Sequence, residues 1–542
     1  MSVSSSVKVL LVSSVVLFGA CTKMPRQVKY IPKNTASVIT IDRNSMFEKS
    51  ETKGERATKK VLAYLASYGF SNETFDFSVE TVFAPTDLTG VASESEIMAY
   101  LIPSTEFRNA YKCMSIMLSD SAQFSTFLHK HLGENYVRLE GTNKCVCYVN
   151  NDRYSWVAYN DEMALFGSAM LHTKGIVECI NDIFTTTDGS LAINTDFRSF
   201  YKKRNDVSVW MATDKCIETY LLWYSDIPAL FNSIAMPEYV HVDASFDTDL
   251  NVSFSSVPKA SFKRYWKKNN FMRKQFDSSF CSVLPSNSLW FVSMAVEPSL
   301  LSKQFSNTSF YEYIEKELSK LNLQVSDFVN SFSGEVAFSM YDVSLEPIRT
   351  FAFQKTVSVV NTMVWKHFQK DEKSTFPHIA LAFSLKDSKI PVFVLNHISQ
   401  DACAQVIPGV YDFSKLMGFP LKVVCRDEAM IVTTDDAYAR QLVENKEIQS
   451  DSENMVSSLV NNVQGNVSYH YIDFTIKNYP ETVHKYLHQL GADSLVYSYS
   501  NIVKSAEMRV SDSYSGTINV SFQDTTKNSL LQLNDLLEIV LP

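Results

Sequence analysis

Short runs of alternating apolar and polar residues recur along the chain and predict β-strands. They are residues 37–41 (SVITI), 96–103 (EIMAYLIP), 250–256 (LNVSFSS), 379–387 (IALAFSLKD) and 517–523 (TINVSFQ). Apolar residues at helical spacing predict helices at 54–69 (GERATKKVLAYLASYG) and 309–322 (SFYEYIEKELSKLN). The strands come in clusters joined by short turns, without strict strand–helix–strand alternation. This pattern predicts an α+β fold with largely antiparallel sheets that helices cover on one face.

The same pattern occurs twice. YIPKNTASVITIDRNSMFEK, from Tyr30, is echoed by VLPSNSLWFVSMAVEPSLLSK, from Val283. Four further landmarks follow in the same order: a helical segment, a turn glycine before a strand (DLTGVA, SFSGEVA), a turn before a strand (YNDEMALFGS, CRDEAMIVTT) and the tetrapeptide NVSF. Matches that keep their order over this length indicate an internal duplication. We therefore predict two tandem duplicated α+β domains, at residues 30–278 and 279–542.

The N-terminus is typical of an exported protein. MSVSSSVKVLLVSSVVLFGA has a single Lys8, an apolar run and a small-residue end, and Cys21 follows directly. We interpret residues 1–20 as a lipoprotein signal peptide, Cys21 as the lipidated residue and residues 21–29 as a linker. The alternative is an ordinary cleaved signal with a chance cysteine. No acidic cluster follows Cys21, which favours the periplasmic face of the outer membrane over the cell surface.

The composition argues against nucleic-acid binding and against a nucleotide cofactor. The formal net charge is −9, which argues against nucleic acid as a partner because phosphate contacts need a basic face. Only 15 glycines occur in 542 residues, and neither GxGxxG nor GxxxxGK[ST] is present. Because phosphate-binding loops need glycines, we expect no nucleotide cofactor, and no other cofactor is indicated.

A family resemblance rests on the anchor cysteine, the YIPKNTASVITI opening with its internal echo, and the SGTINVSFQD…NSLLQL ending. With these features the chain resembles the Bacteroidota lipoproteins classed as domain of unknown function 4836, over essentially the whole mature length. The resemblance implies an envelope lipoprotein without an established activity. It supplies no catalytic residues.

Eight cysteines remain after Cys21, an even number that permits disulfides in an oxidising compartment. Their spacing does not require them, so most are interpreted as small core residues, with room for one or two disulfides in the first half. Cys145 and Cys147 would share one face of a strand, which is an awkward geometry for a mutual bridge.

Carboxylate and histidine pairs are the candidates for catalysis. Asp161-Glu162 and Asp427-Glu428 stand directly before predicted strands. Neighbouring strand residues point to opposite faces, so a polar turn explains each pair better than a glycosidase site. His484 and His488 have zinc-ligand spacing on a helix, but Lys485 stands where a metalloprotease carries glutamate. His129 and His131 form a similarly incomplete pair, and no metal site is predicted.

Two surface features remain. The segment KASFKRYWKKNNFMRK has two interpretations. It is an amphipathic helix whose lysines lie on the solvent-exposed face, or it is a contact for an anionic surface. Its candidate contact residues are Lys263, Arg264, Lys267 and Lys268. Three Asp-Ser/Thr triplets resemble O-glycosylation acceptor motifs of Bacteroidota envelopes, with Ser121, Ser494 and Thr525 as the acceptors.

Together these observations predict a lipid-anchored envelope protein, more a non-enzymatic binding or scaffold protein than an enzyme. Its expected partners are the membrane, through the anchor, and an envelope protein or glycan. The alternative is an envelope hydrolase that acts on glycan or peptide with a site between the two repeats. A glycan-binding role further predicts exposed Trp or Tyr rings.

Overall fold

The structure is a computed structural model. It describes residues 24, 26–50, 86–132, 134–150, 154–185, 189–221, 237–260, 263–264, 267, 270–277, 279–285, 287–306, 309–344, 376–397, 403–417, 419–426, 428–444, 459, 462–512 and 514–540. The chain forms two compact units: unit 1 comprises residues 1–247 and 254–262, and unit 2 comprises residues 248–253 and 263–542. The boundary at 278/279 comes from the repeated sequence pattern and stays a prediction.

Unit 1 is built on an antiparallel sheet. Its strands are β1 (Ser37–Ile41), β2 (Ile97–Ser104), β3 (Asn109–Met117), β4 (Val137–Arg138), β5 (Val146–Asn150), β6 (Ser155–Tyr159), β7 (Met163–Ala169), β8 (Val207–Ala212) and β9 (Pro237–Phe246). They pair in the order β4-β5-β6-β7-β3-β2-β1-β8-β9. β10 (Leu250–Pro258), in which the division between the units falls, pairs with β9. β1 matches the predicted strand residue for residue.

Short helices connect these strands. They are η1 (Arg26–Tyr30), α2 (Arg43–Lys49), α5 (Thr86–Thr89), α6 (Ser121–His131), α7 (Ile176–Thr185), η2 (Leu191–Ile193), α8 (Thr195–Tyr201) and α9 (Thr213–Leu221). Side-chain caps start several of them: Asp42 accepts a hydrogen bond from Ser45 N, and Asp120 accepts one from Gln123 N. The predicted helix at 54–69 lies outside the described residues.

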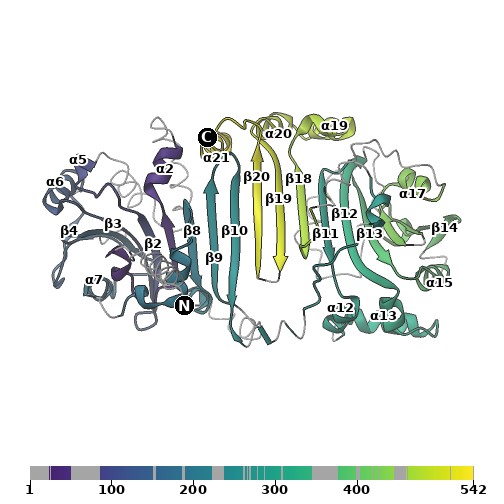
Figure 1. Cartoon of the computed structure of the whole chain (residues 1–542), viewed down its shortest axis with the longest axis horizontal. Coiled ribbons are helices and arrows are strands. Elements are labelled where there is room, and N and C mark those ends of the chain that lie inside the picture. The colour runs from purple at the N-terminus through teal and green to yellow at the C-terminus, as the bar shows by residue number, and fades with distance from the viewer. Residues whose placement is uncertain are drawn as a thin grey trace, which may run out of the picture. The chain divides into compact units, whose positions relative to one another are not determined.

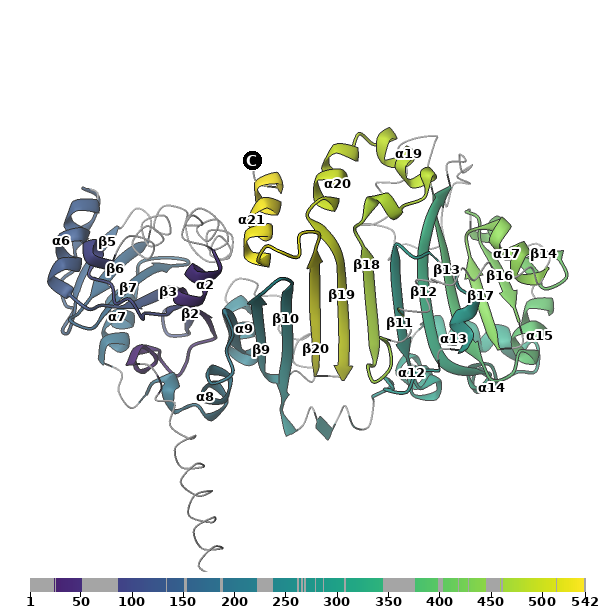
Figure 2. The same ribbon diagram turned by 45° about the horizontal axis from the view of Figure 1, so that its top comes forward.

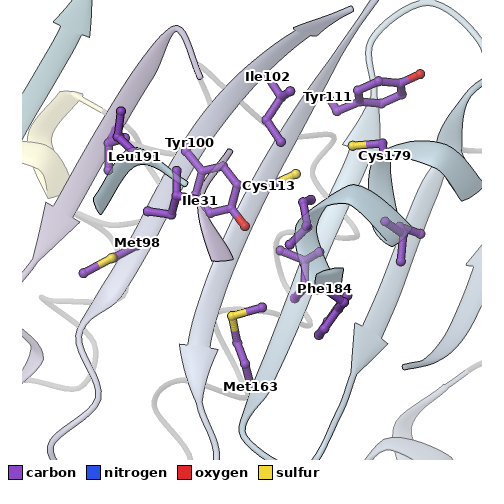
Figure 3. Close-up of a cluster of buried hydrophobic side chains, with 14 of the residues drawn as sticks. Ile31, Met98, Tyr100, Ile102, Tyr111, Cys113, Met163, Cys179, Phe184 and Leu191 are labelled. Atoms are coloured by element: carbon purple, nitrogen blue, oxygen red, sulfur yellow. The ribbon is translucent and has the colours of Figure 1, made fainter. Parts of the chain in front are cut away.

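The core of unit 1 lies between one sheet face and the helices. α7 is strongly amphipathic and buries its apolar face there, with Ile176, Ile180 and Ile183. The sheet contributes large side chains such as Trp156 and Trp210, and Figure 3 shows part of this cluster. The prediction that helices cover one sheet face is wrong for unit 1. α6 packs on the other face, where its Phe124 contacts Tyr159 and Phe166.

Unit 2 contains a second set of antiparallel strands. Its strands are β11 (Trp290–Ala295), β12 (Phe332–Ser344), β13 (Phe376–Leu385), β14 (Ala404–Ile407), β15 (Val410–Asp412), β16 (Lys422–Cys425), β17 (Ala429–Thr433), β18 (Ser468–Asp473), β19 (Val503–Asp512) and β20 (Ser515–Phe522). They pair in the order β14-β15-β16-β17-β13-β12-β11-β18-β19-β20. Read position by position, this order repeats that of unit 1, with β11 in the place of β1 and β20 in the place of β10.

The helices of unit 2 are η3 (Ser279–Val283), α12 (Pro298–Phe305), α13 (Ser309–Ser319), α14 (Val325–Asn330), α15 (Lys389–His397), α16 (Ser414–Met417), α17 (Asp436–Val443), η5 (Ile476–Asn478), α19 (Glu481–Gln489), α20 (Asp493–Ser500) and α21 (Ser529–Val540). Figures 1 and 2 show α19 and α20 at one end of the long strands of unit 2 and α12 at the other end. α13 matches the predicted helix at 309–322 in its first eleven residues.

A cluster around Phe291, Ala337, Ile431 and Tyr469 forms the main core of unit 2. α17 packs into it through Tyr438, Ala439 and Leu442. Among the described residues, no helix is both long and apolar enough to cross a membrane.

One glycine in each unit stands just before or at the start of an equivalent strand. Gly90, ahead of β2, has φ +70°, and Gly334, near the start of β12, has φ +105°. A Cβ atom on Gly90 would collide with the carbonyl oxygen of Asp120, and one on Gly334 with that of Val296. Only glycine fits such a conformation and so close a backbone approach. These are the two turn glycines of the repeated sequence pattern.

Candidate functional site

The structure places part of the predicted basic surface. Lys263, Arg264 and Lys267 are exposed. Lys268 and the interleaved aromatic residues 262, 265 and 266 lie outside the described residues, as does the predicted lipidation residue Cys21.

The three predicted acceptor hydroxyls differ in their surroundings. Ser121 is the first residue of α6, and its Oγ donates a hydrogen bond to Asp161 Oδ1 at 3.1 Å. Ser494, on α20, and Thr525, in the turn after β20, are exposed. Ser494 and Thr525 are therefore the more accessible acceptors, and their glycosylation stays a prediction.

The carboxylate pair of unit 1 lies in the turn between β6 and β7. Glu162 accepts a hydrogen bond from Tyr30 Oη at 2.9 Å, and Asp161 accepts the one from Ser121. In unit 2, Glu428 is exposed at the corresponding turn, and residue 427 lies outside the described part. The contacts of Asp161 and Glu162 fasten a turn to its neighbours, which is a structural role.

The histidine pairs lie on helices. His484 is half-buried on α19, and its Nδ1 lies 3.2 Å from Tyr497 Oη. His131 Nδ1 contacts the Phe127 carbonyl oxygen at 2.8 Å, one turn back along α6. Across the described residues, no three His, Cys, Asp or Glu side chains gather as ligands for a metal ion.

The feature that most resembles a binding site is the sheet face of unit 2 opposite its main core. We call it the open face. All of its side chains are exposed or half-buried. It consists of Trp290, Val292 and Met294 on β11, Val336, Phe338 and Met340 on β12, Ile379, Leu381 and Phe383 on β13, His470 and Ile472 on β18, Ala506, Met508 and Val510 on β19, and Ile518 and Val520 on β20.

Strand register places these side chains together. Trp290 pairs with Met340 on one side and with Ile472 on the other, and Val292 pairs with Phe338 and His470. Directly paired residues of antiparallel strands point to the same face. The pairing continues through β19 to β20, so that one apolar surface extends over six neighbouring strands.

Trp290 is the most exposed side chain of this surface. Its exposed fraction is 42 %, that of Ile472 is 37 %, and the Trp290 ring packs edge-on against Phe338 with centroids 5.2 Å apart. Of the surrounding helices, α19 contacts the surface near Met340, where Tyr486 and Leu487 pack. Exposure is concentrated at Trp290 and Ile472, and an apolar surface with such exposed side chains is typical of a contact site in soluble proteins.

Unit 1 has a related surface opposite its own core. Ile39, Ala99, Val209 and Val242 are half-buried and lie in one cross-strand row over β1, β2, β8 and β9. Its side chains are smaller, and the row lacks an aromatic ring. We therefore place the stronger candidate site on unit 2.

His470 is the one titratable side chain of the open face. Burial lowers the pKa of His470 below its ordinary value. Its face neighbours across the strands are Val292 and Met508, and its Nε2 lies 3.4 Å from Ser468 Oγ. The surface is therefore neutral and apolar at neutral pH.

The lowered pKa predicts an acid sensitivity of unit 2. Above about pH 6.5, His470 is neutral in the folded and unfolded states and contributes no pH dependence. As the pH falls below this value, the unfolded state binds the proton first, so stability is lost. Between pH 7.5 and 5.5 the thermal unfolding midpoint of the wild type should fall further than that of His470→Gln. Equal falls in both chains would contradict the assignment.

Sequence reasoning missed the open face, although a signal was present. In WFVSM, both Phe291 and its neighbours Trp290 and Val292 are apolar, so β11 is apolar on both sides. A strand of this kind is buried on both faces or has one face available for a partner.

Crystal form III of TP0453 matches with 5 % sequence identity and a TM-score of 0.27 over 47 % of this chain and 91 % of that chain. Crystal form I of TP0453 matches with 6 % identity and a TM-score of 0.27 over the same shares. No curated protein matches the sequence. The model of one family, the domain of unknown function (DUF4836), matches residues 28–530. Because that match spans most of its length, the chain belongs to the DUF4836 family.

Proposed function

We propose that this chain is a non-catalytic, lipid-anchored protein of the cell envelope that binds another envelope protein through the open face of unit 2. The observation that carries the proposal is the apolar surface over β13, β12, β11, β18, β19 and β20, with Trp290 exposed within it.

The chemistry of the surface favours a protein partner over a glycan. A sugar ring stacks on an aromatic ring and also needs polar groups that bond its hydroxyls. The nearest cross-strand neighbours of Trp290 are Met340, Ile472 and Phe338, none of which can form such bonds. An apolar protein surface, whose burial removes these side chains from water, complements them better.

The open face would form one part of a larger interface. Six strands at about 4.8 Å spacing span about 25 Å, and alternate residues along each strand cover about 15 Å. This footprint of about 375 Å² is under half of the roughly 800 Å² per partner of a standard interface, so the partner would also contact residues around the open face. Trp290, at one end of the open face, would act as an aromatic anchor, the type of residue that dominates binding energy.

We also propose that the two units arose by tandem duplication. The matched strand order of the two units supports this, as do Gly90 and Gly334 at equivalent positions with positive φ.

The anchor and location remain part of the proposal. The signal-like residues 1–20 and Cys21 support a lipidated N-terminus, and the absence of acidic residues directly after Cys21 supports the periplasmic face of the outer membrane. Several acyl chains at about 0.8 kcal/mol per buried methylene would hold the protein firmly at the membrane.

Affinity capture from crosslinked envelopes tests the function. We expect the wild type to retain one partner reproducibly. The double variant Trp290→Ser, Ile472→Ser should capture at least about tenfold less of this partner, since hot-spot tryptophans contribute 2 kcal/mol or more. Leu490→Ser is the matched control, because it removes a leucine that is 60 % exposed outside the open face. A Cys21→Ser chain should leave the membrane fraction. Equal capture by the wild type and the double variant would refute the binding surface, and turnover of an envelope substrate by purified protein would refute the non-catalytic role.

A further inference from the structure

Two thiols face each other in the core of unit 1. Cys113 lies on β3 and Cys179 on α7, and both belong to the same buried cluster. Figure 3 shows their sulfur atoms directed toward one another. All eight cysteines of the described chain carry free thiols.

The surroundings of the pair make it unreactive once folded. Burial, and next to it the Cys113 thiol, raise the pKa of Cys179 well above its ordinary value. Burial likewise raises the pKa of the neighbouring Tyr100 hydroxyl, which interacts with both cysteines. Because the thiolate is the attacking species in disulfide exchange, the pair has to react before the core closes.

We infer that Cys113 and Cys179 form a disulfide as unit 1 folds in an oxidising compartment. The oxidant is an external disulfide of the glutathione or oxidoreductase type. A thiolate of one cysteine attacks it and releases one thiol, and the second cysteine then attacks the mixed disulfide and releases the other thiol. One S–S bond forms as one breaks, and the two protons leave with the two released thiols.

The topology gives this bond a structural effect. It would join β3 to α7 across 179 − 113 = 66 residues, a stretch that contains α6 and β4 to β7. Crosslinking a loop of this length restricts the unfolded chain strongly. A disulfide between Cys145 and Cys147, which are two residues apart, would hardly restrict the unfolded chain.

In the cell this inference rests on the exported location proposed above, but its test does not. The purified full chain is unfolded, reduced and refolded in a mixture of oxidised and reduced glutathione, and its remaining thiols are then alkylated for mass spectrometry. We expect one crosslinked peptide pair, Cys113 with Cys179, and two fewer alkyl groups than in the reduced control. The thermal midpoint of unit 1 should rise by about 10 °C relative to the reduced chain.

Three variants sharpen the result. Cys113→Ser and Cys179→Ser should each abolish the crosslink and the rise in midpoint, while Cys216→Ser, in the same unit, should keep both. The inference is overturned if both thiols stay free after refolding or if Cys179 joins another cysteine. If the bond forms in glutathione but is absent from protein made in cells, the exported location fails and the pairing stands.

Discussion

Replacing Gly334 with alanine should destabilise unit 2 by about 3 kcal/mol or more. Gly334 has φ +105°, and an added Cβ would collide with the carbonyl oxygen of Val296, whose amide donates a hydrogen bond to Gly334 O. The backbone cannot yield without breaking this contact between β12 and the end of β11. Hydrogen exchange of β12 peptides measures the effect, because it reports the local free energy of opening.

Other glycines provide controls for this prediction. Gly465 (φ +81°) and Gly491 (φ +64°) also have a positive φ, but an added Cβ there would meet no atom within 4 Å. Their alanine variants should lose only the stability that positive φ costs an alanine, about 1 kcal/mol. Gly90→Ala should behave like Gly334→Ala, with the loss in unit 1. If all four variants were equally mild, the close approach would not be what requires glycine.

Replacing Asp206 with alanine should cost unit 1 about 3–5 kcal/mol, since removal of one partner leaves buried groups unpaired. Asp206 accepts hydrogen bonds from Ser45 Oγ at 2.5 Å, Lys49 Nζ at 2.6 Å and Phe246 N at 2.7 Å. This one carboxylate therefore fastens α2, the start of β8 and the end of β9 together. Hydrogen exchange of α2 and β9 peptides should show the loss in both elements.

Asp247 is the matched control, because it is the other partner of the same lysine. Lys49 Nζ lies 3.1 Å from Asp247 Oδ1, but the Asp247 side chain is 63 % exposed. Asp247→Ala should therefore cost about 1 kcal/mol or less, as exposed ion pairs do. If Asp247→Ala lost as much stability as Asp206→Ala, the charge of the carboxylate alone would stabilise this region. The burial of Asp206 and its bond to the Phe246 amide would then not matter.

Local patterns predicted individual elements well. SVITI became β1 because its alternation buries Val38 on the core side while Ile39 faces away. The turn glycines were identified by their place before a strand. The strand order could not be predicted in this way, because β1 pairs with β2 and β8, whose residues are far apart in sequence. Such pairings depend on the closure of the whole sheet.

The candidate site was harder to predict than the fold. Aromatic residues such as Trp156, Trp210 and Trp290 look alike in the sequence, yet Trp156 and Trp210 are buried and Trp290 is not. The difference arises from which sheet face the helices cover, a tertiary property. In the same way, Cys113 and Cys179 meet because α7 packs over β3, and nothing in their spacing indicates it. The Asp161-Glu162 pair lies in a turn before a strand, as its position predicted, and the histidine pairs lie on helices.

The open face has a consequence for the life of the protein in the cell. A wide apolar sheet surface is an aggregation hazard for every molecule that has not yet met its partner. If the chain is exported as proposed, new copies would need escort by chaperones, and envelope proteases would clear surplus copies. The abundance of this protein would then follow that of its partner, so that loss of the partner gene would show itself as loss of this protein.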